Sequence, residues 1–180
     1  MEYKLRNLEK KDLNGMLEWM HDSRINSLYT DKIRNATSAD VIKFIEDAQR
    51  LIKEGKAYHY AIVNAHDEYL GTISLKNIVP VKGAEYAISM RGAYQGKGIA
   101  SWATEEILRI AFEELKLHRV YLNVLTENEN ACRFYSRKCF RYEGESRSCI
   151  QVGGEIRSLK WYAMLKEEYE ERCDHIKKLN

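Results

Sequence analysis

The sequence of 180 residues has little of what marks fibrous, disordered, membrane-spanning or disulfide-stabilised chains. One proline and ten glycines exclude collagen-like and low-complexity classes. The four cysteines include no Cys-x-x-Cys pair, so we expect reduced, buried thiols rather than a disulfide framework or a zinc site, and no metal cofactor. No apolar run is long enough to cross a membrane, and the first residues form no signal segment, so we expect a cytoplasmic protein without membrane contact.

Charges of both signs are nearly balanced along the chain. The sequence has 29 basic and 27 acidic residues, a net charge of +2, so we expect no nucleic-acid partner. Apolar residues make up 44%, enough for the core of one domain, whereas 180 residues are too few for two well-packed ones. We therefore expect a single domain over 1–180, with a charged, solvated helical tail over about 166–180.

The spacing of apolar residues predicts an α+β fold. Leu13, Met16, Leu17 and Met20 recur at helical spacing, and the capping box at 37–40 begins a second helix. A long helix follows residue 98 and a short one covers 127–138, so the predicted order is βααβββαβαββ. Three central strands with turns at 64–67 and 80–83 indicate an antiparallel meander, and Gly153-Gly154 predicts a final hairpin. Strands are predicted at 3–7, 57–64, 69–78, 83–90, 119–125, 139–150 and 155–164.

The segment Gln-Gly-Lys-Gly-Ile-Ala at 95–100 stands between a predicted strand and the long helix. Closely spaced glycines let a ligand approach the backbone, and free N–H groups at a helix start favour phosphate or pyrophosphate. A Walker loop needs Ser or Thr where Gly98 follows Lys97, and a dinucleotide fingerprint needs glycine where Ser101 stands. The alternative is a plain glycine-containing helix start.

Several motifs stand in the order found in one enzyme superfamily. Gln95, Gly98 and Ala100 match Gln/Arg-x-x-Gly-x-Gly/Ala, and Asn128 followed by Tyr135 matches an Asn-x-x-Ala…Tyr helix. Over 3–165 the sequence resembles the GNAT superfamily of N-acetyltransferases, with the RimJ/RimL-like branch most similar. The resemblance implies the GNAT fold, a mixed and mostly antiparallel sheet that is splayed at the cofactor cleft and flanked by helices, with acetyl-CoA as co-substrate.

One position departs from the family pattern. The family usually ends the short helix with Leu-Gly-Phe, whereas this chain has Lys138, Cys139 and Phe140. A left-handed cap costs a cysteine about 1 kcal/mol, so either the turn differs or a small strain is tolerated.

The resemblance also implies which residues bind the cofactor. Asn128 would bond the pantetheine end, although it could simply cap its helix, and Lys97 would add charge at the rim, although it could be solvated. The pantetheine arm would lie along the backbone of Ile88, Ser89 and Met90. The pyrophosphate would lie on the N–H groups of Gln95, Gly96, Lys97, Gly98, Ile99, Ala100 and Ser101.

Catalysis in this family requires a neutral amine. An amine of pKa near 10 is neutral in roughly one molecule per thousand at pH 7, so a base must remove a proton at a cost of about 4 kcal/mol. Glu85 is the candidate base and Tyr135 the candidate acid for the departing thiolate, with a backbone N–H near Ser89 or Met90 at the oxyanion. Alternatively, Glu85 pairs with a lysine or arginine, and Tyr135 is a core aromatic residue. We expect none of the five histidines to be catalytic.

We expect an N-acetyltransferase that moves an acetyl group to a primary amine by direct attack in a ternary complex; the alternative is a non-catalytic acetyl-CoA-binding domain. The acceptor is a small amine, either an amino sugar or a polyamine, or a protein N-terminus. A homodimer through an exposed strand edge at 155–164 is compatible with the sequence. The side chains that could choose the acceptor are an aromatic and polar group (Trp19, His21, Asp22, Asn26, Tyr29), carboxylates (Glu85, Glu127, Glu129, Asp31) and basic residues (Arg24, Lys32, Arg34).

Overall fold

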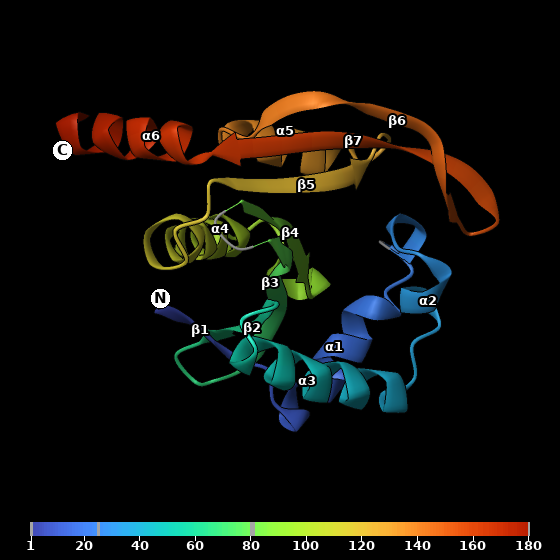
Figure 1. Cartoon of the computed structure of the whole chain (residues 1–180). Coiled ribbons are helices and arrows are strands. Elements are labelled where there is room, and N and C mark those ends of the chain that lie inside the picture. Colours follow the sequence, from blue (N-terminus) through green and yellow to red (C-terminus); the bar gives the residue numbers. More distant parts are fainter. Residues whose placement is uncertain (1, 25, 80–81, 180) are drawn as a thin grey trace.

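A single sheet of seven strands organises the chain in this computed structural model (Figure 1), which describes residues 2–24, 26–79 and 82–179. The side chains of Asn26 and of residues 174–179 fall outside that description. The turn that we predict over 80–83 falls partly on residues 80–81, outside the described part. The strands are β1 Tyr3–Asn7, β2 Tyr58–Asn64, β3 Tyr69–Val79, β4 Gly83–Met90, β5 Arg119–Leu125, β6 Arg141–Val152 and β7 Glu155–Leu165.

The strand order is β1-β2-β3-β4-β5-β7-β6, and every neighbouring pair is antiparallel except β4 and β5. The predicted mixed, mostly antiparallel sheet of an α+β fold is confirmed. The predicted exposed edge at 155–164 is wrong, because β7 pairs with β5 on one side and with β6 on the other. The outer strand is β6, because the chain passes from β5 through the next helix to the far side of β7.

Helices cover both faces of the sheet. In Figure 1, α1 and α3 lie on one side of β2 and β3, and α4 lies on the other. Of these, no helix in the described ranges is both long and apolar enough to cross a membrane. The helices are α1 Leu13–Met20, α2 Asp31–Arg34, α3 Ser38–Lys53, α4 Ile99–Arg109, α5 Glu129–Arg137 and α6 Lys166–Leu179.

Helix α3 illustrates how the sequence sets the local structure. Thr37 caps its start, and the side chain of Asp40 returns a bond to the Thr37 backbone, the predicted capping box. Val41 and Ile45 are buried, and they pack with Trp19 of α1 in the cluster of apolar residues that fills this face of the sheet. Both helices are therefore fixed against the sheet.

The opposite face holds the larger core, built by α4 and α5. Helix α4 continues beyond Arg109 into a π turn over Ile110–Glu114. Tyr86 of β4 is buried beneath α4, and its hydroxyl group shares a 2.8 Å hydrogen bond with Thr104. Because successive strand residues face opposite ways, Glu85, Ala87 and Ser89 belong to the face covered by α1 and α3.

We predicted that the C-terminal helix is solvated, and this is wrong for part of its length. Tyr169 is buried, and its ring is stacked on Phe112 with 5.0 Å between centroids. The Tyr169 hydroxyl donates a 2.7 Å hydrogen bond to Glu113. The charged composition of the segment hid this apolar contact, which joins α6 to the end of the π turn.

Cys139 is exposed, as is Cys149, so the prediction of buried thiols is wrong for these two residues. Cys139 adopts the left-handed conformation, with φ of 65°. The turn therefore keeps the geometry that glycine would favour, and the chain tolerates the strain of a side chain there, about 1 kcal/mol. The Phe140 N–H donates to the Tyr135 carbonyl at 3.1 Å, which ends α5 and returns the chain toward β6.

Candidate active site

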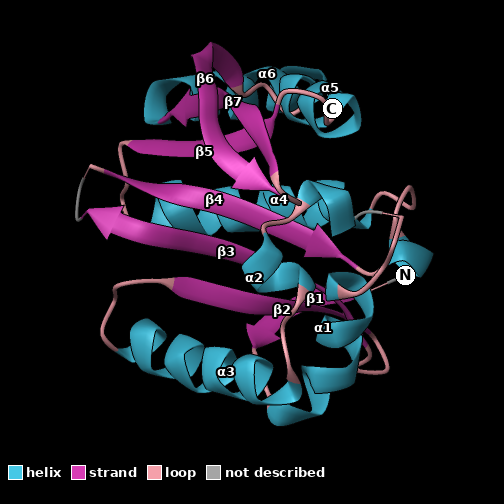
Figure 2. Cartoon of the chain, turned by 90° about the vertical axis from the view of Figure 1, so that its right-hand side faces the viewer, coloured by secondary structure: helices cyan, strands magenta, loops and turns pink. Residues whose placement is uncertain are grey.

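The sheet splits between β4 and β5. The two strands pair only over Gly83–Glu85 and Arg119–Tyr121, and beyond Glu85 the described part of β4 has a strand partner on the β3 side alone. Figure 2 shows the two strands diverging from this paired end. The backbone of Ile88, Ser89 and Met90 borders the gap, so it can form a ladder with an extended ligand.

The glycine segment lies directly beyond the open end of the split. A single 3₁₀ turn over Gly92–Tyr94 leads from β4 into it, and α4 begins at Ile99. Gly96 and Gly98 have φ of 72° and 79°, and no atom lies within 4 Å of a Cβ built on either of them. The backbone therefore takes a left-handed course that glycine allows, and it faces open space.

The start of α4 is prepared for an anion. Gly98 is the N-cap residue and brings no capping side chain, and the first turn contains no acidic residue. The first N–H groups of a helix lack partners within the helix, and the helix dipole places partial positive charge there. Ile99 is buried and fixes the helix start in the core, while Lys97 is exposed with its Nζ 5.3 Å from the Tyr94 ring centroid.

Tyr135 lies on the α4 side of the split. Its ring packs edge-on against Tyr86, with centroids 5.9 Å apart, and its hydroxyl group has no hydrogen-bond partner among the described residues. Burial raises the pKa of Tyr135 well above the usual value of 10, and nearby Tyr29, from the other side of the sheet, raises it further. The Tyr135 side chain therefore remains protonated at neutral pH.

Glu85 lies where the split begins, on the other face from Tyr135. Lys76 Nζ is 2.9 Å from its Oε1, Asn77 Nδ2 donates to its Oε2 at 2.7 Å, and Asn123 Nδ2 donates to its Oε1 at 3.3 Å. The alternative interpretation of Glu85 as a carboxylate paired with lysine thus describes its resting contacts. A substrate proton would reach it by displacing one partner or through water.

Asn128 caps α5 through its side-chain oxygen, which leaves its NH₂ group available as a donor. Its Oδ1 accepts a 3.2 Å hydrogen bond from the Ala131 N–H, which is the predicted capping role. Within the described residues its side-chain NH₂ group has no partner. Capping thus leaves Asn128 able to donate to a ligand that lies in the split.

The aromatic and polar group of the first two helices does not form one pocket. Trp19 is buried and donates to the Tyr69 hydroxyl at 3.0 Å, and Tyr29 packs 5.2 Å from the Trp19 ring. His21 bonds the Ala36 carbonyl instead, and Asp22 pairs with Arg24. The Asn26 side chain is outside the described residues.

Tyr29 is the member of this group that reaches the split. Its hydroxyl group donates to Ser89 Oγ at 3.2 Å, from the face that the α1–α2 connection covers. Sequence reasoning missed this contact, and the alternation of Glu85, Ala87 and Ser89 on β4 is the signal that could have suggested it.

The carboxylates that we considered for a polyamine are all engaged. Each has a basic partner within 4 Å, which lowers the attraction left for a cationic ligand. The same holds for Arg24 and Arg34, two of the three basic candidates, which pair with Asp22 and Asp31. The carboxylate pairs are Glu85 with Lys76, Glu127 with Arg157, Glu129 with Arg133 and Asp31 with Arg34.

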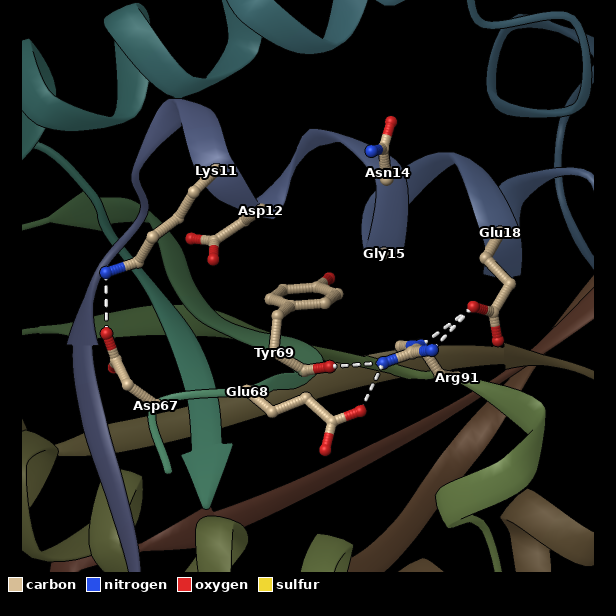
Figure 3. A pocket seen from close by; sticks show the side chains of 9 residues that line it. All are labelled: Lys11, Asp12, Asn14, Gly15, Glu18, Asp67, Glu68, Tyr69 and Arg91. Atoms are coloured by element: carbon tan, nitrogen blue, oxygen red, sulfur yellow. Dashed lines mark hydrogen bonds and ion pairs between the residues drawn. The ribbon is translucent and has the colours of Figure 1, made fainter. Parts of the chain in front are cut away.

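A cavity of about 340 Å³ lies between α1 and the start of β3, beside the residue that follows β4 (Figure 3). Arg91, the residue after β4, extends across it from the sheet to Glu18 of α1. The remaining lining residues are Lys11, Asp12, Asn14, Gly15, Asp67, Glu68 and Tyr69. Sequence reasoning did not identify Arg91, because its importance comes from partners distant in the sequence.

Comparison with known proteins decides the family. The family model described as acetyltransferase (GNAT) domain matches residues 3–140, which include the split, the glycine segment and Tyr135. The chain belongs to this GNAT family. It is an acetyl-CoA-dependent N-acetyltransferase, and the predicted GNAT fold is confirmed.

Relatives of this GNAT protein differ in their acceptors. Spermidine N(1)-acetyltransferase of Escherichia coli (strain K12) is 27% identical over 169 residues, 92% of this chain and 87% of that protein. "Putative ribosomal N-acetyltransferase YdaF" of Bacillus subtilis (strain 168) is 36% identical over 101 residues, 56% of this chain and 55% of that protein. The structure of spermidine N-acetyltransferase from Vibrio cholerae in complex with CoA and spermine has a TM-score of 0.82 at 24% identity, covering 93% of this chain and 98% of that one. At this identity the structural likeness shows the fold alone.

Proposed function

We propose that this GNAT protein acetylates a primary amine by direct attack on acetyl-CoA in a ternary complex, and that the acceptor is a small polyamine-like molecule. The observation that carries the proposal is the meeting of two features, the split beside β4 and the uncapped glycine start of α4. The split suits an extended arm with amide groups, and the helix start suits a diphosphate. CoA joins these two chemistries in one molecule.

We assign the cofactor contacts to the residues that the sequence suggested, apart from the N–H group of Gln95. The pantetheine arm pairs with the backbone of Ile88, Ser89 and Met90, and the free NH₂ group of Asn128 donates to its far end. Lys97 adds charge at the rim. Gln95, whose own N–H donates to the Gly92 carbonyl at 3.3 Å, begins the bend. The N–H groups that hold the diphosphate are those of Gly96, Lys97, Gly98, Ile99, Ala100 and Ser101.

We assign the chemistry to side chains on the two faces of the split. The amine approaches from the α1 side, where Glu85 accepts its proton directly or through water. A backbone N–H at Ser89 or Met90 stabilises the oxyanion. The neutral nitrogen forms the C–N bond, the C–S bond then breaks, and Tyr135 gives its proton to the departing thiolate from the α5 side. The second proton that the nitrogen loses passes through water and restores the Tyr135 hydroxyl group. The opposite placement of Glu85 and Tyr135 supports this division, because proton removal and proton donation occur on different atoms.

Replacing Glu85 with glutamine tests the base. We expect kcat/KM at pH 7 to fall about 100-fold, within the usual range for a general base, and this loss to become smaller toward pH 10, because more of the amine is then neutral without a base. The measurement is kcat/KM for the acceptor from pH 6 to pH 10.

Glu127→Gln is the matched control for this variant. Like Glu85, Glu127 forms an ion pair, in its case with Arg157. It lies beyond the end of β5, and we give it no catalytic role. Its pH profile should match that of the wild-type protein. An unaltered profile in Glu85→Gln would assign proton removal to water or to another group.

The acceptor class rests on the relatives. Spermidine N(1)-acetyltransferase aligns over 92% of this chain, which favours a polyamine-like amine. The higher identity with YdaF over 101 residues favours a second candidate, a ribosomal-protein N-terminus, as in a RimJ/RimL-like branch.

Because the two apolar clusters are built on one sheet, we also propose that residues 1–180 act as a single domain.

A panel of acceptors tests the function. CoA release from acetyl-CoA is measured with spermidine, with peptides carrying free N-termini and with amino sugars, each with its N-acetylated form as a blank. We expect turnover with spermidine and none with acetylspermidine that lacks the reacting amine. Turnover with peptides alone would transfer the assignment to the second candidate. Stoichiometric CoA binding without turnover on any amine would favour a non-catalytic acetyl-CoA-binding domain.

A further inference from the structure

The stretch that leads from β4 into the glycine segment is held by side chains from other elements. Arg91 Nη1 is 3.0 Å from Glu68 Oε1 and donates to the Tyr69 carbonyl at 2.9 Å. Its Nε and Nη2 donate to Glu18 Oε2 at 3.0 and 2.7 Å. Figure 3 shows Arg91 between α1 and the start of β3, with bonds to both. One guanidinium group thus joins the end of β4 to two other elements.

Tyr94 extends this arrangement to the residue that directly precedes the segment. Its hydroxyl group donates to Glu68 Oε1, the oxygen that Arg91 also contacts, and the Arg91 guanidinium carbon is 5.2 Å from the Tyr94 ring centroid. The hydrogen bond from Tyr94 lowers the pKa of Glu68 and keeps that carboxylate charged beside Arg91. Lys97 Nζ lies 5.3 Å from the same ring centroid. Glu68, Arg91 and Tyr94 are hereafter called the brace.

The brace ends where the open backbone begins. The Arg91 carbonyl accepts from the Tyr94 N–H at 3.0 Å, and Gln95 Nε2 donates to the Met90 carbonyl at 3.3 Å. At Gly96 and Gly98, by contrast, the position that a Cβ atom would take is open. Two glycines in left-handed conformations lose much backbone freedom when they are ordered on a ligand. When the residues that precede Gly96 are already held in place, less conformational entropy is lost as the diphosphate binds.

We propose that Arg91 is a positioning residue, which through Glu68 and Tyr94 holds the glycine segment in its diphosphate-binding conformation. The inference rests on the proposed site for CoA. The brace touches neither the amine nor the thioester in that site, so it sets the affinity for the diphosphate part of the cofactor and leaves the chemical step unchanged.

Two variants test the brace. Arg91→Gln removes the charge and most of the bonds, and Tyr94→Phe removes only the hydroxyl group that bonds Glu68 while it keeps the ring beside Lys97. We expect the KM for acetyl-CoA and the Kd for CoA to rise about tenfold in Arg91→Gln, which is about 1.4 kcal/mol, and about threefold in Tyr94→Phe. The kcat at saturation should remain within twofold of wild type in both. Arg91→Lys, which keeps one arm of the fork, should recover part of the affinity.

S-acetylpantetheine separates positioning from general damage to the fold, because it carries the thioester without the diphosphate. We expect kcat/KM for S-acetylpantetheine to be unchanged in Arg91→Gln and Tyr94→Phe. The matched control is Arg119→Gln: Arg119 also pairs with a glutamate, Glu143, and lies 5.6 Å from the ring of Tyr121, but it stands at the paired end of the split. This control should leave the KM for acetyl-CoA unchanged.

Three outcomes would overturn the inference. Equal losses with acetyl-CoA and S-acetylpantetheine would show a structural role only, and unchanged CoA affinity in both brace variants would show that the segment needs no brace. A loss in Arg119→Gln as large as in Arg91→Gln would remove the specificity of the effect. A wild-type protein that binds no CoA contradicts the proposed function itself, and that result is recognisable before any variant is made.

Discussion

Gly98→Asp is expected to raise the Kd for CoA at least 100-fold. Gly98 has φ of 79° and open space at its Cβ position, so an aspartate fits without a clash and places a carboxylate at the helix start. Aspartate accepts left-handed geometry better than most residues, which limits the strain. Two unit charges 4 Å apart repel by about 4 kcal/mol at an effective dielectric constant near 20, well above the 2.7 kcal/mol that 100-fold requires. Calorimetric titration with CoA measures the effect.

Two controls isolate the charge at position 98. Gly98→Asn has nearly the same shape and no charge, and it should weaken CoA binding no more than about tenfold. Gly55→Asp places the same side chain at another open left-handed glycine, with φ of 67°, after α3 and away from the split, and it should leave binding unchanged. Equal CoA affinity in Gly98→Asp and wild type would remove the glycine segment from the cofactor site.

Tyr135→Phe is expected to lower kcat about 100-fold, with the Kd for CoA within twofold of wild type. The substitution keeps the buried ring against Tyr86 and removes only the hydroxyl group that lacks a partner among the described residues. Burial raises the pKa of Tyr135, so the group is still protonated when the thiolate departs and its O–H can donate to the sulfur. Single-turnover rates at saturating acetyl-CoA and amine measure the chemical step without product release.

Tyr86→Phe is the control for Tyr135→Phe. Tyr86 is buried in the same aromatic group, but its hydroxyl group is already bonded to Thr104 of α4. We expect its loss to reduce thermal stability and to change the single-turnover rate less than threefold. If Tyr135→Phe turned over as fast as wild type, the proton for the thiolate would have to come from another group or from water.

The sequence predicted the elements that depend on local patterns. The capping box at Thr37 and Asp40, the alternation along β4 and the glycines at 96 and 98 each act over a few residues, and the structure has them as expected. Pairing between distant strands was less accessible. β6 is the edge strand because the chain that leaves β5 through α5 returns on the far side of β7. No local pattern near 155–164 contains that information.

Contacts between distant side chains were the part that the sequence could not supply. The bond from Tyr29 to Ser89 joins residues 60 apart, and the bonds from Arg91 reach back 73 residues to Glu18. The Glu85 carboxylate shows the same limit: its charge was evident, but its pairing with Lys76 depends on strand register. Motifs therefore supplied the candidate residues of the site, and the fold determined which side chains contact them.

A crystal structure of the protein with CoA tests the central claim most directly. The account predicts the pantetheine arm in the split, bonded to the backbone of Ile88–Met90, with its sulfur close to the Tyr135 hydroxyl group. It also predicts the diphosphate on the N–H groups of Gly96–Ser101. CoA bound elsewhere on the protein, or a diphosphate that leaves these N–H groups without contact, would contradict the account.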